Sequence, residues 1–314
     1  MLVYEFKIRN MKKIFITMTM ISVFFGCKYD DDYLNPKLET KAYFASKTEY
    51  TRSVIVGEGM QFRIGAAMSG VIENTRNETV DMIINKNAVL SEGKTLLPDT
   101  HYNSSELSGT IQATIPAGDF LGYFTVRMDS INFLSDVKSL TGEYAIPVKI
   151  VGTSLESVNE ELSFIQVFVK YMSTIDGYYL YRSTVKKEVA GAIVEEETIT
   201  ESYPNESDNS TFRLETKAPF TVSVTPAVSS FMNGLKFDLT LNEEDNTVTV
   251  GAVSGFPEVV ADGENIYNKK TRDFILNYKY TENGTVYHVS QELIFRNRMV
   301  DGINQTREYL SYFN

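Results

Sequence analysis

Apolar and polar side chains alternate along most of this chain, and a period of two narrows the folds that it can adopt. From Met60 to Met68 every second residue is apolar. Successive side chains of a β-strand point to opposite faces, so this run predicts a strand with one face in a core. Four further runs have the same pattern: Val80, Met82 and Ile84; Ile111, Ala113 and Ile115; Phe124, Val126 and Met128; and Tyr144, Ile146, Val148 and Ile150. The fold class expected is therefore all-β.

Turn-forming residues separate the alternating runs. Gly57-Glu58-Gly59 predicts a hairpin turn between two of them. Asn242 to Asn246 is a polar loop between two later runs, and Asn283-Gly284 joins two more. Asn-Gly between alternating runs predicts a two-residue β-hairpin, because both residues tolerate positive φ. No stretch predicts a helix of convincing length.

The strands group into two predicted domains. Residues 41–173 have short strands at the spacing typical of an Ig-like β-sandwich. Residues 174–314 have longer hairpins, which predict an antiparallel barrel or sandwich, including a lipocalin-like barrel. Phe164 to Tyr171 is apolar on both faces, as expected of a strand inside a sheet or of one that leads out of the domain. The boundary is expected between Ser173 and Gly177.

The first 26 residues are predicted to be a secretory signal peptide. Met11-Lys12-Lys13 is followed by an apolar run from Ile14 to Phe25, which is too short for a membrane-spanning helix. Gly26-Cys27 then resembles the cleavage site of bacterial lipoproteins, which implies acylation of Cys27, the one cysteine of the chain. Several acyl chains on one residue would form a stable membrane anchor.

Residues 27–40 are expected to be an acidic linker. Lys28-Tyr29-Asp30-Asp31-Asp32 resembles the export signal that sends Bacteroidetes lipoproteins to the outer face of the outer membrane, and the alternative is a solvated linker. The formal net charge of −11 argues against nucleic acid as a partner, because phosphate binding needs Lys and Arg. The expected location is the outer membrane, with the protein lipid-anchored and facing the cell exterior.

Catalytic and metal-binding motifs are scarce. The two histidines, His101 and His288, lie in different predicted domains. His288 alternates with Val286 and Ser290, which favours a solvent-facing or half-buried imidazole over a ligand. Two SxxK matches, 91–94 and 183–186, lie in strand or loop contexts where a catalytic serine is not expected. We therefore expect no enzyme activity, no metal and no cofactor.

Aromatic residues offer a different chemistry, because the C–H faces of sugar rings stack on flat side chains. Tyr102, Tyr267 and Tyr287 lie in or near predicted loops or hairpin arms and are candidate ligand-binding residues if they are exposed. The alternative for each is ordinary packing in a core. The absence of Trp argues against a strong glycan site.

Almost the full chain resembles a family of two-domain surface lipoproteins from Bacteroidetes polysaccharide-utilisation loci. In the first domain, of unknown function, the resemblance rests on Ala42 to Phe44, Ile64 to Gly70, Leu96 to Pro98 with Tyr102, Ile115 to Gly118, and Tyr144 to Val148. In the second domain it rests on Asp176 to Tyr179 and Phe295 to Arg298. The resemblance implies a glycan-binding accessory protein that works beside a TonB-dependent transporter of the outer membrane.

Three other functions stay open. An adhesin or pilus-like subunit would polymerise by strand addition at an open sheet edge. A glycan-active enzyme would have a deep pocket with convergent carboxylates. A ligand-holding barrel in the second domain would enclose a cavity.

Overall fold

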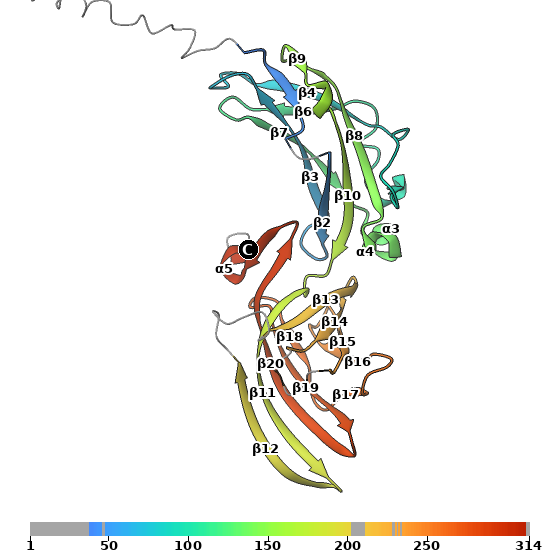
Figure 1. Cartoon of the computed structure of the whole chain (residues 1–314), viewed down its shortest axis with the longest axis vertical. Helices are drawn as coiled ribbons and strands as arrows, with labels where there is room; N and C mark the ends of the chain where they lie inside the picture. The colour runs from blue at the N-terminus through green and yellow to red at the C-terminus, as the bar shows by residue number, and fades with distance from the viewer. Residues whose placement is uncertain are drawn as a thin grey trace, which may run out of the picture.

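The computed structural model describes residues 38–45, 48–201, 211–227, 230, 232 and 234–311. The chain is almost entirely β, which confirms the predicted fold class. Figure 1 shows two β domains stacked along the longest axis of the molecule. The helices that the structure describes are short, and none of them is long and apolar enough to cross a membrane.

The described residues of the first domain form ten strands, two short α-helices and two 3-10 turns. In chain order these are β1 (Lys41–Tyr43), β2 (Glu49–Ile55), β3 (Gln61–Ser69), β4 (Glu78–Ile84), β5 (Thr95–Leu96), η1 (Asp99–His101), β6 (Ile111–Ile115), β7 (Leu121–Arg127), α3 (Ser130–Ser135), α4 (Val137–Thr141), β8 (Tyr144–Thr153), β9 (Ser157–Val158), η2 (Glu160–Leu162) and β10 (Phe164–Met172).

Two sheets form the sandwich of this domain. One sheet has the order β7-β3-β1-β9, and the other has the order β2-β10-β8-β4-β6 with β5 beside β8. The initial strands divide between the sheets, because β1 pairs with β3 whereas β2 pairs in parallel with β10. The strand β10 lies between β2 and β8, as expected of a strand that is apolar on both faces.

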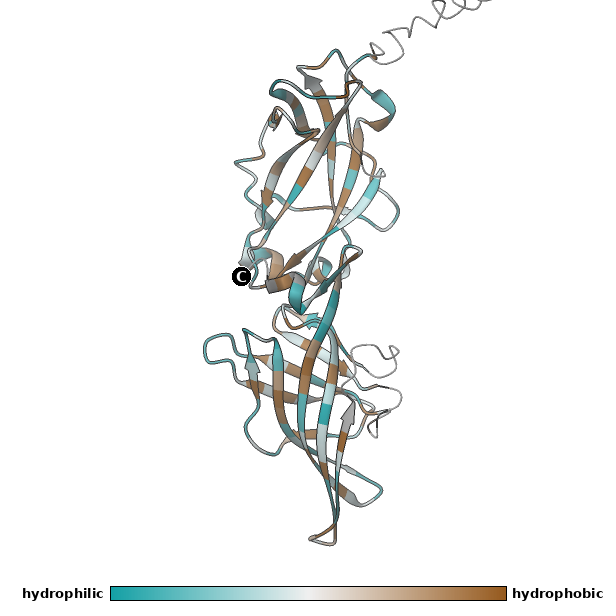
Figure 2. Ribbon diagram, turned by 90° about the vertical axis from the view of Figure 1, so that its left-hand side faces the viewer, coloured by the Kyte–Doolittle hydropathy of each residue, from teal (hydrophilic) through white to brown (hydrophobic). Residues whose placement is uncertain are grey.

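The core of the first domain lies between the two sheets. Ile64 and Ala66 of β3 and Val126 of β7 come from one sheet, and Ile146 and Val148 of β8 come from the other. All five side chains are buried, as the period of two predicts. Figure 2 shows hydrophobic and hydrophilic segments alternating along the strands of both domains.

The predicted hairpin turn at Gly57-Glu58-Gly59 is wrong. This turn joins β2 to β3, which belong to different sheets, so the chain crosses from one sheet to the other. Gly57 and Gly59 have φ of 81° and 92°, which glycine adopts without steric cost. A sequence pattern identifies the turn but not the pairing of the strands on either side. The crossing places Glu58 at the end of the sandwich that meets the second domain.

The second domain is built on a single strongly curved sheet. Its elements are β11 (Gly177–Val189), β12 (Ala192–Glu201), β13 (Phe212–Ala218), β14 (Thr221–Thr225), β15 (Phe237–Leu241), β16 (Val248–Ala252), β17 (Val259–Ala261), β18 (Ile266–Asn268), β19 (Asp273–Glu282), β20 (Thr285–Val300), β21 (Ile303–Thr306) and α5 (Arg307–Ser311). The sheet order is β16-β15-β14-β13-β11-β20-β19-β17, with β12 on β11, β18 on β19 and β21 on β20.

The two ends of this sheet approach each other and nearly close a barrel. The backbone N–H of Val248 donates to the carbonyl of Asn265 (2.9 Å), and the N–H of Tyr267 donates to the carbonyl of Asn246 (2.9 Å). The interior is packed with side chains, many of them aromatic: Tyr179, Tyr181, Phe212, Phe237, Phe274 and Tyr278 are buried in one cluster. The domain is therefore barrel-like with a filled core. Aromatic side chains occupy the interior that a lipocalin uses to hold a ligand.

Long hairpins extend from this core to the end of the molecule that is far from the first domain (Figure 1). The strands β19 and β20 meet at Asn283-Gly284, where φ is 50° and 78°. Positive φ at both residues confirms the two-residue hairpin predicted from Asn-Gly. The strands β11 and β12 meet at Ala190-Gly191 and form the neighbouring tip.

Side chains of both domains meet in an ion cluster at the junction. Both oxygens of Glu58 accept hydrogen bonds from the guanidinium of Arg298, at 2.8 and 2.6 Å. Arg272 and Thr174 donate to the same carboxylate at 2.9 and 2.8 Å. Arg298 is 1% exposed, so the junction buries a complete cation against its carboxylate partner.

Candidate functional site

A polar groove lies on the outer face of the long hairpins, where three strands run side by side. In register, Lys186 of β11 and Lys279 of β19 flank His288 of β20. Two residues further along β20, Thr184 and Asn277 flank Ser290 in the same way. The residues between them alternate inward, and Val185, Val289 and Tyr278 are buried in the barrel core. Strand alternation therefore collects polar side chains on the outer face.

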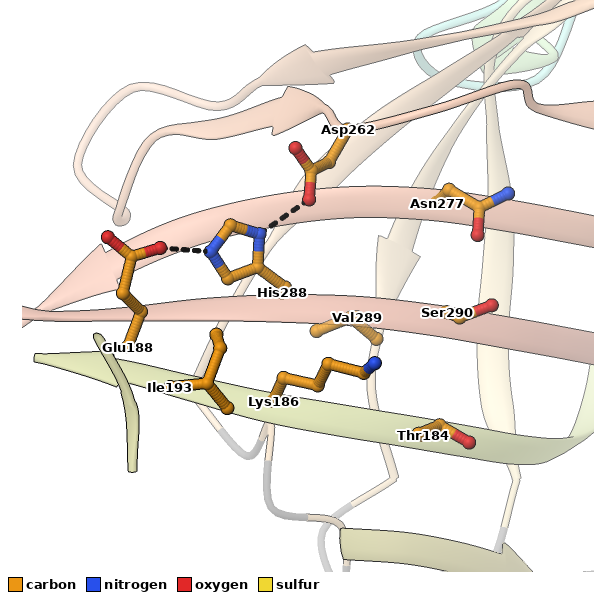
Figure 3. Close-up of a pocket in the computed structure, with 9 residues that line it drawn as sticks. All are labelled: Thr184, Lys186, Glu188, Ile193, Asp262, Asn277, His288, Val289 and Ser290. Carbon is orange, nitrogen blue, oxygen red and sulfur yellow. Dashed lines mark hydrogen bonds and ion pairs between the residues drawn. The ribbon is translucent and has the colours of Figure 1, made fainter. Parts of the chain in front are cut away.

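His288 lies between two carboxylates that come from different parts of the chain (Figure 3). Its Nδ1 is 2.6 Å from Asp262 Oδ2, and its Nε2 is 2.8 Å from Glu188 Oε2. Asp262 follows β17, whereas Glu188 is near the end of β11. The half-buried imidazole agrees with the strand alternation in the sequence, and the structure adds its two partners.

The ionisation of this cluster follows from its contacts. The hydrogen bonds that the imidazole makes to Asp262 and then to Glu188 raise the pKa of His288 above its ordinary 6.5. Burial alone would raise the pKa of Asp262, but the hydrogen bond and charge of His288, with Lys279, lower it overall. A protonated imidazole can donate to both carboxylates at once, so proton binding stabilises the cluster.

Asn277 holds the loop that carries Asp262. Its side-chain amide donates to the carbonyl of Glu264 at 2.6 Å. Its backbone N–H donates to Asn265 Oδ1 at 2.6 Å, and its carbonyl accepts from the N–H of Asp262 at 2.9 Å. These bonds fix the loop between β17 and β18 against β19, and the loop in turn positions Asp262 beside His288.

The groove has a volume of about 320 Å³. Its lining is Thr184, Lys186, Glu188, Ile193, Asp262, Asn277, His288, Val289 and Ser290. A second hollow of about 300 Å³ shares Glu188 and His288 and continues over Glu258, Val260, Lys279, Tyr280, Thr281 and Val286. Hydroxyls, an amide and paired charges therefore line a shallow surface that crosses several strands. Such a surface can hydrogen-bond a ligand that carries many hydroxyl groups.

The structure places the three candidate tyrosines away from this groove's lining. Tyr102 is 5% exposed, and its hydroxyl donates to Asp99 Oδ1 at 2.9 Å. Tyr267 is 3% exposed and packs on Phe274, with ring centroids 4.8 Å apart. Tyr102 and Tyr267 therefore do not meet the condition of exposure, because tertiary packing covers both rings.

Tyr287 differs from the other two candidates. It is partly exposed near the start of β20 and stacks on Tyr280, with ring centroids 4.9 Å apart and an angle of 7° between the rings. One face of the Tyr287 ring is thus occupied by another tyrosine. The three residues do not come together into one site.

The two SxxK matches have no catalytic geometry. Ser183 is buried and accepts a hydrogen bond from Gln291, whereas Lys186 lies on the opposite, outer face of β11. Ser91 donates to Glu49, and Lys94 donates to the carbonyl of Gly142. In neither case does the lysine reach the serine hydroxyl, which a general base requires.

Other expected features can be placed only in part. His101 is buried, with Nε2 3.1 Å from Asp136 Oδ2. Among the described residues, no group of three or more His, Cys, Asp or Glu has an arrangement that could hold a metal ion. Cys27, the predicted lipidation site, lies outside the described residues, as does the acidic cluster that follows it.

The groove residues could not be singled out from the sequence. Thr184, Ser290 and Asn277 are ordinary polar residues of alternating strands, and Asp262 is in a loop. The useful signal was local: His288 and Ser290 share one face of a strand. The register that sets them beside β11 and β19 is a property of the folded sheet.

Two family models match the chain in sequence order. A model described as an N-terminal domain matches residues 33–157, and one described as a C-terminal domain matches residues 170–294. Together they span most of the chain. No curated protein matches the chain.

Several solved structures are similar to the chain. A Bacteroides ovatus protein of unknown function has a TM-score of 0.64 at 19% identity and covers 86% of this chain and 98% of its own. A second B. ovatus protein of unknown function has a TM-score of 0.39 at 11% identity, covering 84% and 97%. A lipoprotein of Bacteroides thetaiotaomicron has a TM-score of 0.25 at 10% identity, covering 81% and 98%. The first of these likenesses shows a shared fold.

Proposed function

We propose that this chain, which belongs to the two-domain lipoproteins of Bacteroidetes, binds glycans at the cell surface while anchored in the outer membrane by acylated Cys27. The signal peptide, the Gly26-Cys27 junction and the acidic residues after it support the anchor and its outward orientation. In this account the protein works beside a TonB-dependent transporter, as the family resemblance implies.

The observation that carries glycan binding is the polar groove around His288. Its hydroxyl groups (Thr184 and Ser290), its amide (Asn277) and its charged groups (Lys186 and Asp262) can each pair with a sugar hydroxyl. Carboxylate and ammonium groups lie together in the groove, so a neutral polyhydroxylated ligand meets both donors and acceptors. A shallow, partly open groove suits a segment of a chain better than a small enclosed molecule.

The position of the groove also supports the proposal. The groove is near the tips of the β11–β12 and β19–β20 hairpins, at the far end of the second domain. The first domain lies between it and the N-terminus. A protein anchored at Cys27 would thus present the groove away from the membrane, where an extracellular polysaccharide is accessible.

Isothermal titration against a panel of host and plant glycans tests the proposal. The mature chain is expected to release or absorb heat with at least one glycan of the panel. Replacing Ser290 by Trp fills the middle of the groove from an exposed strand position, and we expect it to lower the affinity roughly tenfold or more.

Thr249→Trp is the matched control. Thr249 is an exposed residue of β16, outside the groove, so the same bulky side chain there should leave the affinity unchanged. The absence of heat across the whole panel would contradict glycan binding. Equal affinity of the wild-type and Ser290→Trp chains would exclude this groove as the site.

A further inference from the structure

Exposed apolar side chains collect at the end of the first domain from which the N-terminus leaves. We name this set the apolar rim: Leu38, Val71, Ile72, Phe120 and Leu121. Each of the five is more than a third exposed, and Ile72 is 74% exposed. Isolated exposed apolar residues are common on proteins, but a contiguous group of them marks an interaction surface.

The rim comes from three segments that lie against one another. A Cβ atom at Gly70 would be 2.4 Å from the carbonyl oxygen of Glu39, so the segment after Leu38 passes directly over the start of the Val71–Ile72 loop. The N–H of Met68 donates to the carbonyl of Phe120 at 3.0 Å, which joins this loop to the third segment. The three segments that carry the rim residues are therefore adjacent.

A buried side chain fixes the shape of the rim. Asn74 is 3% exposed, and its amide donates to the carbonyls of Pro116 and Asp119 at 2.8 and 2.9 Å. The N–H of Gly118 donates to the carbonyl of Asn74 at 2.7 Å. These bonds lock the loop before β4 to the loop before β7. The loops hold Ile72 and Phe120 outward instead of folding them into the core.

The length of chain before the rim limits what can cover it. Leu38 is only eleven residues after Cys27, and eleven extended residues span about 40 Å at most. If Cys27 carries the acyl anchor of the proposed function, on which this inference rests, the rim stays close to the bilayer. We propose that the apolar rim inserts into the lipid surface as a second membrane contact beside the acyl chains.

The charges around the rim argue against electrostatic attraction to lipid headgroups. Glu39 is paired with Lys41 at 2.9 Å, and the guanidinium of Arg76 is paired with Glu78. Asp119 and Glu73 add negative charge. Without a cationic excess, attraction to anionic headgroups does not drive the contact, so burial of apolar area must. Insertion should therefore occur on zwitterionic vesicles and persist at high salt.

The absence of Trp from the chain makes insertion measurable by fluorescence. Ile72→Trp places a single indole in the rim. Ile131→Trp is the matched control, because Ile131 is 78% exposed in α3, which follows the opposite end of β7. The acylated full chain is bound to phosphatidylcholine vesicles with and without brominated acyl chains. We expect bromine to quench the Ile72→Trp chain several-fold more strongly than the Ile131→Trp chain.

The outcomes separate this inference from the proposed function. Vesicle flotation first shows whether the chain is anchored, and a chain that stays in solution overturns both the anchor and the inserted rim. A chain that floats but shows equal, weak quenching at positions 72 and 131 overturns only the rim. Glycan titration of the Ile72→Trp chain tests the distant groove independently, and its affinity should equal that of the wild type.

Discussion

At the scale of single residues, Glu58 links the two domains. Its carboxylate accepts hydrogen bonds from Arg298 and Arg272, both of the second domain. Arg298 is almost completely buried, so the carboxylate is the main compensation for a cation that has lost its water. Burial opposes ionisation of Glu58, but Arg298 and then Arg272 outweigh it and lower its pKa from 4.5 to about 2.

The pH dependence of stability should reveal this ion cluster. A carboxylate with a lowered pKa in the folded state stabilises the protein above its unfolded pKa, and the stabilisation is lost as pH falls toward the folded pKa. We therefore expect the free energy of unfolding to fall between about pH 5 and pH 2, by up to about 3 kcal/mol from this group. Glu58→Gln should be less stable at neutral pH by about 3 kcal/mol and should lose this part of the slope.

Chemical denaturation at a series of pH values provides the measurement. Glu73→Gln is the control, because it removes an exposed carboxylate that makes no contact across the domain junction. Parallel stability curves for the wild-type and Glu58→Gln chains would show that the cluster does not stabilise the junction.

The tyrosines show that residue type alone does not determine whether a side chain is buried or exposed. Tyr267 and Tyr287 both occur beside turns, yet the first is buried and the second is partly exposed. Burial raises the pKa of Tyr267 to about 12, which reflects its place in the barrel core near the ion cluster. An aromatic residue is equally suited to a core and to a sugar-stacking surface, so the choice depends on the strands that pack over it.

At the scale of elements, the β20–β21 hairpin extends from the second domain to the first (Figure 1). Its turn residue Asp301 accepts hydrogen bonds from the backbone N–H and the hydroxyl of Ser53, at 2.9 and 2.8 Å. Ser53 is in β2, the edge strand of its sheet. The hairpin therefore occupies a backbone donor that an open edge would offer to another strand.

Substitution of Asp301 tests the contact of this hairpin. Asp301 has φ of 50°, a conformation that Asn tolerates and Ala disfavours. Asp301→Ala removes the acceptors and strains the turn, so we expect a loss of about 1–2 kcal/mol in the free energy of unfolding. Asp301→Asn keeps one acceptor oxygen and should lose less.

Hydrogen exchange at the Ser53 amide distinguishes the loss of the acceptor oxygens from the strain in the turn. Exchange should be fastest in the Asp301→Ala chain and intermediate in the Asp301→Asn chain. An unchanged exchange rate in both variants would mean that the hairpin does not protect β2.

Local signals in the sequence predicted many of the strands and turns. They did not predict which strands pair when their residues are far apart in the chain. The faces of β3, β4, β6, β7 and β8 followed from alternation, and the Asn283-Gly284 hairpin followed from turn chemistry. The Gly57 to Gly59 turn was misassigned because its strands pair with distant partners. The groove required β11 in register with β20, and the pairing residues of these two strands are about a hundred positions apart.

At the scale of the whole molecule, the two ends have different surfaces. The apolar rim is at the N-terminal end, and the polar groove is near the opposite tips. Between them, the Glu58 cluster and the Asp301 contact tie the domains together. This arrangement fits a protein that stays on a membrane at one end and holds a hydrated ligand at the other.

The two imidazoles of the chain allow a direct test of where a glycan binds. His288 lies in the groove, whereas His101 is buried in the first domain, bonded to Asp136. An NMR titration with the glycan that gives the largest heat in the panel follows both imidazole signals at once. The account predicts a saturable shift of the His288 signals while those of His101 stay in place. Saturable binding that leaves the His288 signals unmoved would contradict it.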